Sequence, residues 1–171
     1  ARRDYPIGGT GHLFDMLKNC YTFSNLIGDG EAFGGIDFID TSGWAQSDAV
    51  GRVGDYPIEL GGADDLRRNI ALAAASGIRT GLYFEGYLVD ENSAVAQRFG
   101  NGWQMIDAAG RRMRYRPEGP EMYMCPLVPA WRHHLASRMA EVAAEVGAHA
   151  VYLDQFGLGG NRRCFASSHG H

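Results

Sequence analysis

Three carboxylates stand where short apolar segments of the sequence end. They are Asp40 in the segment 35–44, Glu85 in 78–85 and Asp154 in 148–156. Buried parallel strands read as continuous apolar runs, and folds built from β–α units place their chemistry where such strands end. We therefore expect the three carboxylates to line one concave site, together with Trp44 or Tyr83.

Each of these side chains also has a purely structural interpretation. Asp154 could cap a helix or accept structural hydrogen bonds, and Asp40 and Glu85 could orient a loop or pair with a nearby arginine. Trp44 and Tyr83 are of a type that more often packs in a core or at a rim, although flat sugar faces do stack on aromatic rings. Both interpretations stay open at this point.

Helical and extended patterns alternate along the chain and would position the carboxylates. Gly77 and Gly147 are expected to end two of the helices, and Pro129 fits the first turn of another. The expected elements are a helix over 13–20, a loop over 24–34, a strand ending at Asp40, a helix over about 63–76, a strand over 78–85, a helix over 129–146 and a strand ending at Asp154.

A long insertion separates the second of these strands from the last helix. Residues 90–116 combine a short helix, expected over about 92–99, with two segments that flank Ala108-Ala109-Gly110. Glycine in a short polar connection between alternating segments is typical of a β-hairpin. We expect this helix and hairpin to lie on the rim of a site.

Alternating strands and helices predict an α/β fold with a parallel sheet. A complete (β/α)8 barrel needs about 250 residues, so three strands in this length fit roughly the first half of a TIM-type barrel. The rival is a doubly wound open sheet, but neither glycine-rich segment, 8–11 or 157–160, stands between a clear strand and a clear helix. We expect one partial barrel domain over 1–171, truncated at one or both ends.

Composition excludes several classes of protein. The chain has 171 residues, 45% hydrophobic and 21% charged, with a formal net charge of −4, which is typical of a globular domain and not of a disordered or membrane protein. The basic segment 111–116 is short and isolated, so a solvated hairpin is a better interpretation than a nucleic-acid patch. We expect neither a nucleic acid nor a membrane as partner.

Sulfur and imidazole groups gather near the C-terminal end. The three cysteines are Cys20, Cys125 and Cys164, and their spacing predicts neither a disulfide scaffold nor a zinc motif. Cys164, His169 and His171 could bind a metal, but a catalytic zinc normally takes three ligands of correct geometry. The favoured expectation is a loop that caps the mouth of a barrel and hydrogen-bonds substrate or backbone, without a metal.

Three sequence segments together resemble a known family. They are Ile-Asp with a nearby Trp over 36–44, Gly-Ile-Arg-Thr-Gly-Leu-Tyr over 77–83 and Gly-Ala-His-Ala-Val-Tyr-Leu-Asp over 147–154. Their order resembles the first half of the barrel in α-galactosidase-like retaining glycoside hydrolases. Within that group the chain is most similar to an uncharacterised bacterial family of glycosidase-like domains, in which an Asp-Gln strand end precedes a Cys and a His-Gly-His.

The resemblance implies roles for particular residues. Asp154 would be the nucleophile at the end of the fourth strand, while Asp40, Trp44 and Glu85 would contact sugar hydroxyls. The general acid/base would lie on a later strand, outside this chain. The Asp-Gln and Cys…His-Gly-His matches add further expected substrate contacts, at Gln155, Cys164, His169 and His171.

The sequence departs from the galactose-specific members of that family. Those carry two adjacent acidic residues before the tryptophan and a lysine two positions before the nucleophile, whereas here Thr41-Ser42-Gly43 precedes Trp44 and Tyr152 takes the place of the lysine. Galactose is therefore not the expected sugar.

The resulting functional hypothesis is a retaining hydrolase of O-glycosidic bonds. It needs no cofactor, takes a carbohydrate substrate and requires the remainder of the parent chain. The alternatives are a non-hydrolytic carbohydrate-binding barrel and, less favoured, a metal-dependent hydrolase.

Overall fold

The computed structural model describes residues 11–12, 23–32, 34–41, 44, 53–58, 62–156 and 162–171. These residues form two compact units. The first contains the described parts of 1–47, 58–83 and 141–152, and the second those of 48–57, 84–140 and 153–171. Strands β3 and β6 and helix α4 each contribute residues to both units.

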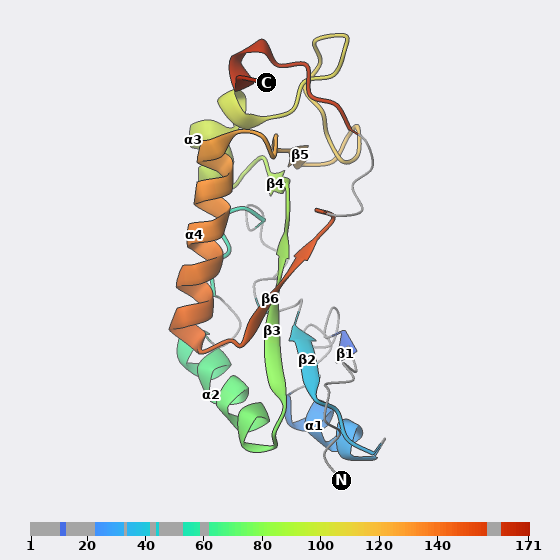
Figure 1. Cartoon of the computed structure of the whole chain (residues 1–171), viewed down its shortest axis with the longest axis vertical. Coiled ribbons are helices and arrows are strands. Elements are labelled where there is room, and N and C mark those ends of the chain that lie inside the picture. The colour runs from blue at the N-terminus through green and yellow to red at the C-terminus, as the bar shows by residue number, and fades with distance from the viewer. Residues whose placement is uncertain are drawn as a thin grey trace. The chain divides into compact units, whose positions relative to one another are not determined.

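The first unit is organised by a parallel sheet with the strand order β1-β2-β3-β6. Strand β2 runs parallel to β1 on one side and to β3 on the other, with Asp40 in register with Gly81 (Figure 1). The three predicted strands are therefore neighbours, as expected for successive β–α units. The strands are β1 (Gly11–His12), β2 (Phe38–Thr41), β3 (Arg79–Glu85) and β6 (Ala150–Asp154).

Helix α2 (Gly62–Ala75) confirms the helix predicted over about 63–76. Leu66, Ile70 and Ala73 are its buried residues, because their spacing places them on one face. After the helix the chain passes through Gly77 at a φ of 77°, a conformation that glycine adopts without steric cost, and enters β3 two residues later.

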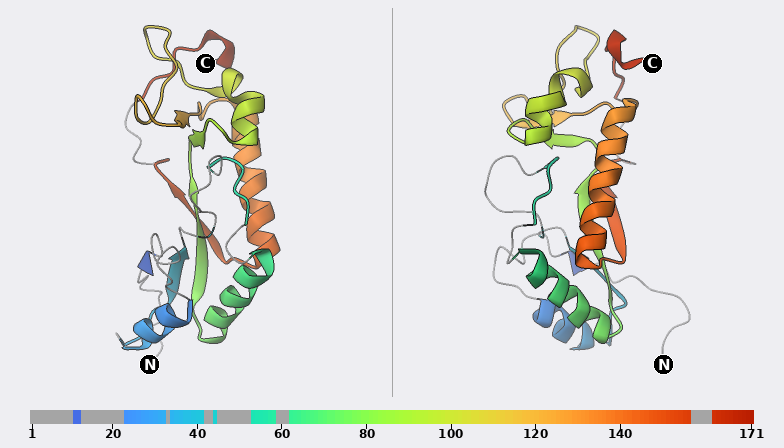
Figure 2. Two further views of the ribbon diagram at one scale, coloured as in Figure 1. Left: turned by 180° about the vertical axis from the view of Figure 1, so that it is seen from behind. Right: turned by 90° about the vertical axis from the view of Figure 1, so that its left-hand side faces the viewer.

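Helix α1 (Phe23–Ala32) corrects the loop that was predicted over 24–34. Its glycines suggested a loop, but packing outweighs that tendency. Ile27 is buried, and a Cβ atom on Gly30 would lie only 2.6 Å from Cγ1 of Ile36. Gly30 thus allows close packing within the unit, where α1 and α2 lie side by side (Figure 2). The helix predicted over 13–20 lies outside the described residues.

The second unit contains the insertion. Its described residues include a hydrogen-bonded pair of strands and three isolated bridges, and the bridge between Ile106 and Arg112 confirms the predicted hairpin. The short helix predicted over about 92–99 is present and extends to Trp103. The unit's own elements are the antiparallel β4 (Leu88–Asp90) and β5 (Glu121–Tyr123), α3 (Ala94–Trp103) and the 3-10 helix η2 (Ser167–His169).

Helix α4 (Pro129–Val146) begins at the predicted proline and ends before Gly147, which has a φ of 73°. Trp131, Leu135, Val142 and Val146 form its buried stripe, and Met139 on the same stripe is half-buried. None of the helices that the structure describes has both the length and the apolar composition needed to cross a membrane.

Candidate functional site

Two of the three predicted carboxylates lie at adjoining strand ends in the second unit. Glu85 is the last residue of β3 and Asp154 is the last residue of β6. The N–H of Gly86 donates a hydrogen bond to the carbonyl of Asp154 at 2.9 Å. A Cβ atom on Gly86 would lie 2.8 Å from that carbonyl oxygen and 2.9 Å from Cβ of Phe156, so only glycine permits this approach.

The backbone turns sharply after Asp154. Gln155 has a φ of 58°, in the left-handed region that residues other than glycine rarely adopt. Its N–H donates to Oδ1 of Asp154 at 2.7 Å, and the N–H of Phe156 donates to the carbonyl of Asp154, also at 2.7 Å. The Asp154 carboxylate is therefore oriented by the adjacent amide, and the strained residue beside it is of a kind that concentrates at functional sites.

Tyr56 positions Glu85 through the main chain. Its hydroxyl accepts a hydrogen bond from the Glu85 N–H at 2.9 Å and donates to the Glu85 carbonyl at 3.2 Å. Only 3% of Tyr56 is exposed, and this burial raises the pKa of its hydroxyl far above the usual range, so the phenol stays protonated. Arg138 in turn donates to the carbonyl of Tyr56 at 2.8 Å.

Sequence reasoning missed Tyr56 because 53–58 reads as a polar connection. The sequence feature that could have pointed to Tyr56 is the presence of a large aromatic residue within a polar connection. An aromatic side chain with a hydroxyl tip can enter a core while satisfying main-chain groups there.

The other predicted residues of the sheet lie in the first unit. Asp40 is 2% exposed on β2, and Trp44 is 1% exposed with its indole N–H donated to the carbonyl of Tyr83 at 2.9 Å. The rings of Tyr83 and Tyr152 stack with centroids 5.6 Å apart, and Tyr152 is 42% exposed. Because Asp40 belongs to a different unit from the strand-end carboxylates, the convergence of all three stays a prediction.

A second cluster lies at the C-terminal end of the second unit. The structure brings Cys164, His169 and His171 together and adds Cys125, with one ligand atom of each within 4.8 Å of the others. Sγ of Cys125 is 3.4 Å from Nε2 of His171, and Sγ of Cys164 is 3.4 Å from Nδ1 of His169. The expected contacts of these residues with substrate stay predictions.

Burial affects the titration of this cluster. It raises the pKa of the Cys125 thiol, with a further contribution from the neighbouring Cys164. It lowers the pKa of His169, which favours the neutral imidazole. A neutral imidazole has a nitrogen lone pair available for a metal ion or a hydrogen-bond donor.

Sequence reasoning passed over Cys125, which is 39 positions before Cys164. The nearest signal was its location just before the predicted helix start at Pro129, where the chain passes from a strand into a helix.

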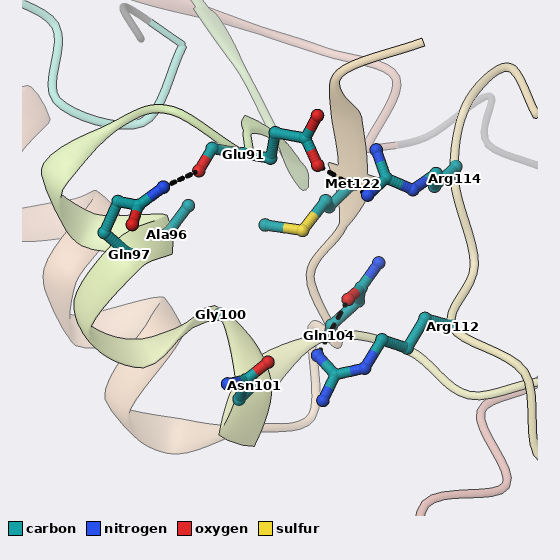
Figure 3. Close-up of a pocket in the computed structure, with 9 residues that line it drawn as sticks. All are labelled: Glu91, Ala96, Gln97, Gly100, Asn101, Gln104, Arg112, Arg114 and Met122. Atoms are coloured by element: carbon teal, nitrogen blue, oxygen red, sulfur yellow. Dashed lines mark hydrogen bonds and ion pairs between the residues drawn. The ribbon is translucent and has the colours of Figure 1, made fainter. Parts of the chain in front are cut away.

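The insertion also forms a polar pocket of about 390 Å³ (Figure 3). Arg114 donates to Oε2 of Glu91 at 2.5 Å, and Arg112 donates to Oε1 of Gln104 at 3.2 Å. Asn101 lines the same pocket. Guanidinium and amide donors next to carboxylate and amide acceptors can hydrogen-bond a ligand that carries hydroxyl groups.

Solved structures with a similar fold include glycosidases. An α-galactosidase from Lactobacillus brevis matches with a TM-score of 0.66 at 14% identity, over 88% of this chain and 20% of the other. The α-galactosidase of Thermus thermophilus, solved with p-nitrophenyl α-D-galactopyranoside, matches with a TM-score of 0.63 at 16% identity, over 89% and 31%. An α-xylosidase from a soil metagenome, solved with xylose, matches with a TM-score of 0.64 at 14% identity, over 85% and 21%.

These likenesses show the fold, which is part of a TIM-type (β/α)8 barrel, as predicted. The chain spans only about a fifth to a third of the length of these solved structures.

At the level of sequence, no curated protein matches the chain. A family model does match residues 34–171, which is more than half of the chain. The chain therefore belongs to the family described as Domain of unknown function (DUF6259).

Proposed function

We propose that this chain is the nucleophile-bearing part of a retaining glycoside hydrolase and that Asp154 is the nucleophile. The observation that supports this proposal is the meeting of two carboxylate-bearing strand ends, Glu85 on β3 and Asp154 on β6, through the hydrogen bond from Gly86. Active sites of barrel enzymes are built at the carboxyl ends of the strands. The shared fold with glycosidases supports the same reaction class.

In this mechanism the carboxylate of Asp154 attacks the anomeric carbon of a bound sugar. A glycosyl ester forms on Asp154 as the glycosidic bond breaks, and the leaving oxygen takes a proton from a general acid. Water then hydrolyses the ester with the same group acting as base. We assign that acid/base group to a later strand of the complete barrel.

The remaining residues bind or orient substrate in this proposal. Glu85 hydrogen-bonds sugar hydroxyls next to Asp154, and Tyr56 keeps its backbone in place. Tyr83 and Tyr152, each two positions before one of the carboxylates, present aromatic rings of which Tyr152 is substantially exposed. Trp44 supports Tyr83 through its indole N–H instead of offering a free ring face.

Asp40 and Gln155 complete the proposed substrate contacts. The tyrosine at position 152, where galactose-specific relatives have lysine, favours a sugar other than galactose.

The experiment compares Asp154→Asn with the surface control Asp29→Asn in the complete protein. Both changes convert an aspartate to a nearly isosteric amide, and Asp29 is exposed on α1. We expect Asp154→Asn to keep the fold and to lose hydrolysis of activated aryl glycosides by several orders of magnitude, because the amide cannot form the glycosyl ester.

The structural role of Asp154 makes a different prediction. An aspartate that only accepts hydrogen bonds would cost roughly 0.5–2 kcal/mol of stability when changed to asparagine and would leave turnover intact. An active, folded Asp154→Asn variant would end the proposal. Asp29→Asn should match the wild-type protein in both measurements.

A second candidate function is carbohydrate binding without hydrolysis, which the polar pocket in the insertion favours. Calorimetric titration with oligosaccharides separates the two functions. Binding that is lost on Asn101→Ala, in a protein that hydrolyses none of the glycosides it binds, would favour this second function.

A further inference from the structure

Four side chains with the chemistry of zinc ligands converge from two separate parts of the chain. Cys125 follows β5 and is 1% exposed, while Cys164, His169 and His171 come from the segment 162–171. One sulfur or ring nitrogen of each lies within 4.8 Å of the others. Two thiols and two imidazoles in this arrangement are a set that structural zinc sites use.

The short distances in the cluster match the dimensions of a zinc site. With Zn–S bonds of about 2.3 Å and Zn–N bonds of about 2.0–2.1 Å, a tetrahedral ion separates a sulfur from a nitrogen ligand by about 3.5 Å. The two sulfur–nitrogen contacts, Cys125 to His171 and Cys164 to His169, are both 3.4 Å. These two pairs of atoms therefore have the spacing of two opposite edges of a zinc coordination tetrahedron.

Main-chain hydrogen bonds fix the position of Cys125. Its N–H donates to the carbonyl of Trp103 at 2.8 Å, and its carbonyl accepts a hydrogen bond from the Val128 N–H at 3.1 Å. Neither bond involves the sulfur atom. The rings of His169 and His171 are in edge contact, with centroids 5.8 Å apart.

We propose that Cys125, Cys164, His169 and His171 bind one Zn²⁺ ion that ties the segment 162–171 to the loop before α4. Two thiolates and two neutral imidazoles cancel the charge of the ion, which suits a partly buried site. Four protein ligands also close the coordination shell, leaving no position for water or substrate. The site is therefore structural, and it does not support the metal-dependent hydrolase.

A metal fits the local architecture of this segment. Its described part contains one element of secondary structure, η2, and few main-chain bonds anchor it, such as that from the Phe165 N–H to the carbonyl of Ile106 at 2.8 Å. Arg162 adds a cation–π contact, 4.4 Å from the ring centroid of Tyr123. A zinc ion would hold the segment at its other end.

The first test measures zinc content in the complete protein, purified under reducing conditions from zinc-supplemented medium. Inductively coupled plasma mass spectrometry should find about one zinc ion per protein chain. Cys125→Ser and His171→Ala should lower zinc affinity at least about tenfold. Cys20→Ser and His133→Ala remove the same types of group elsewhere in the chain and should retain the zinc.

The second test keeps the proposal falsifiable if the ligand variants do not fold. The wild-type protein is stripped with a chelator and titrated with Co²⁺, which should give the intense visible absorption of a tetrahedral thiolate site. Added Zn²⁺ should displace the Co²⁺ and abolish the absorption, whereas Mg²⁺ should not.

Two results would overturn the proposal. One is reduced, folded wild-type protein that holds no zinc and gives only weak octahedral Co²⁺ absorption. The other is a Cys125–Cys164 disulfide, found by peptide mapping, that persists under the reducing conditions used. Neither readout depends on hydrolysis, so the zinc site and the proposed function can fail independently.

Discussion

The strand-end carboxylates and the Cys/His cluster are built in opposite ways, although both belong to the second unit. Glu85 and Asp154 end regular strands, and hydrogen bonds from the Gly86 and Gln155 N–H groups and with the Tyr56 hydroxyl hold them. The cluster joins the loop before α4 to the segment 162–171, which contains the short helix η2, and its members contact one another through side chains. The comparison teaches that the strand ends are set by the fold, whereas the cluster depends on its own side chains and on the proposed zinc ion.

The largest expected effect is on the cluster, through zinc removal. At a free zinc concentration of a thousand times Kd, a bound ion stabilises the folded state by about 4 kcal/mol. Chelation should therefore lower the melting temperature, and hydrogen exchange should accelerate in 162–171 while the Gly86 amide stays protected. Equal acceleration of hydrogen exchange in 162–171 and at the Gly86 amide would show that the cluster and the strand ends unfold together, which would contradict the comparison.

The next effect concerns the support of Glu85. Tyr56→Phe removes the hydroxyl that bonds both the N–H and the carbonyl of Glu85, and it leaves these groups without that partner. We expect a loss of stability near the upper end of about 1–3 kcal/mol, measured by urea unfolding. Tyr115→Phe, at an exposed tyrosine, is the matched control and should change stability by less than about 0.5 kcal/mol. A loss of stability of similar size in Tyr56→Phe and Tyr115→Phe would contradict the positioning role of Tyr56.

A smaller effect is expected where the two strand ends touch. Gly86→Ala places a methyl group against the carbonyl of Asp154, and we expect a cost near the lower end of about 1–3 kcal/mol. Gly28→Ala is the control, because Gly28 lies in α1 with no atom within 4 Å of the added Cβ, and it should stabilise the protein by up to about 1 kcal/mol. Unchanged stability and activity in Gly86→Ala would mean that the strand ends tolerate separation.

The smallest effect is at Gln155. Glycine adopts the left-handed conformation found there without strain, so Gln155→Gly should stabilise the protein by about 1 kcal/mol in thermal unfolding. A destabilised variant would show that the Gln155 side chain contributes more to stability than its backbone conformation costs.

Elements with a strong local pattern could be predicted from the sequence. The apolar spacing of Leu66, Ile70 and Ala73 gives α2, and the run that ends at Asp154 gives β6. A parallel order of the strands follows from the alternation of strands and helices. The adjoining positions of Glu85 and Asp154 follow from the same rule.

Features that depend on distant contacts could not be predicted. Gly30 suits a helix because Ile36 packs against it, which local glycine content does not reveal. The hydroxyl of Tyr56 binds the backbone 29 positions later, and Cys125 meets His171 across 46 positions. In both pairs the residues are far apart in the sequence, and no periodic spacing of residue types links them. Only the folded chain brings the groups together.

The most direct test of the central claim is to trap the glycosyl ester on the complete protein. The protein is incubated with activated 2-deoxy-2-fluoro glycosides of several sugars, which slow hydrolysis of the ester, and is then digested for peptide mass spectrometry. We predict a mass increase of one fluorinated glycosyl group on the peptide that contains Asp154, and none in Asp154→Asn. An adduct on another carboxylate, or substrate turnover by the Asp154→Asn variant at the wild-type rate, would contradict the assignment of Asp154 as the nucleophile.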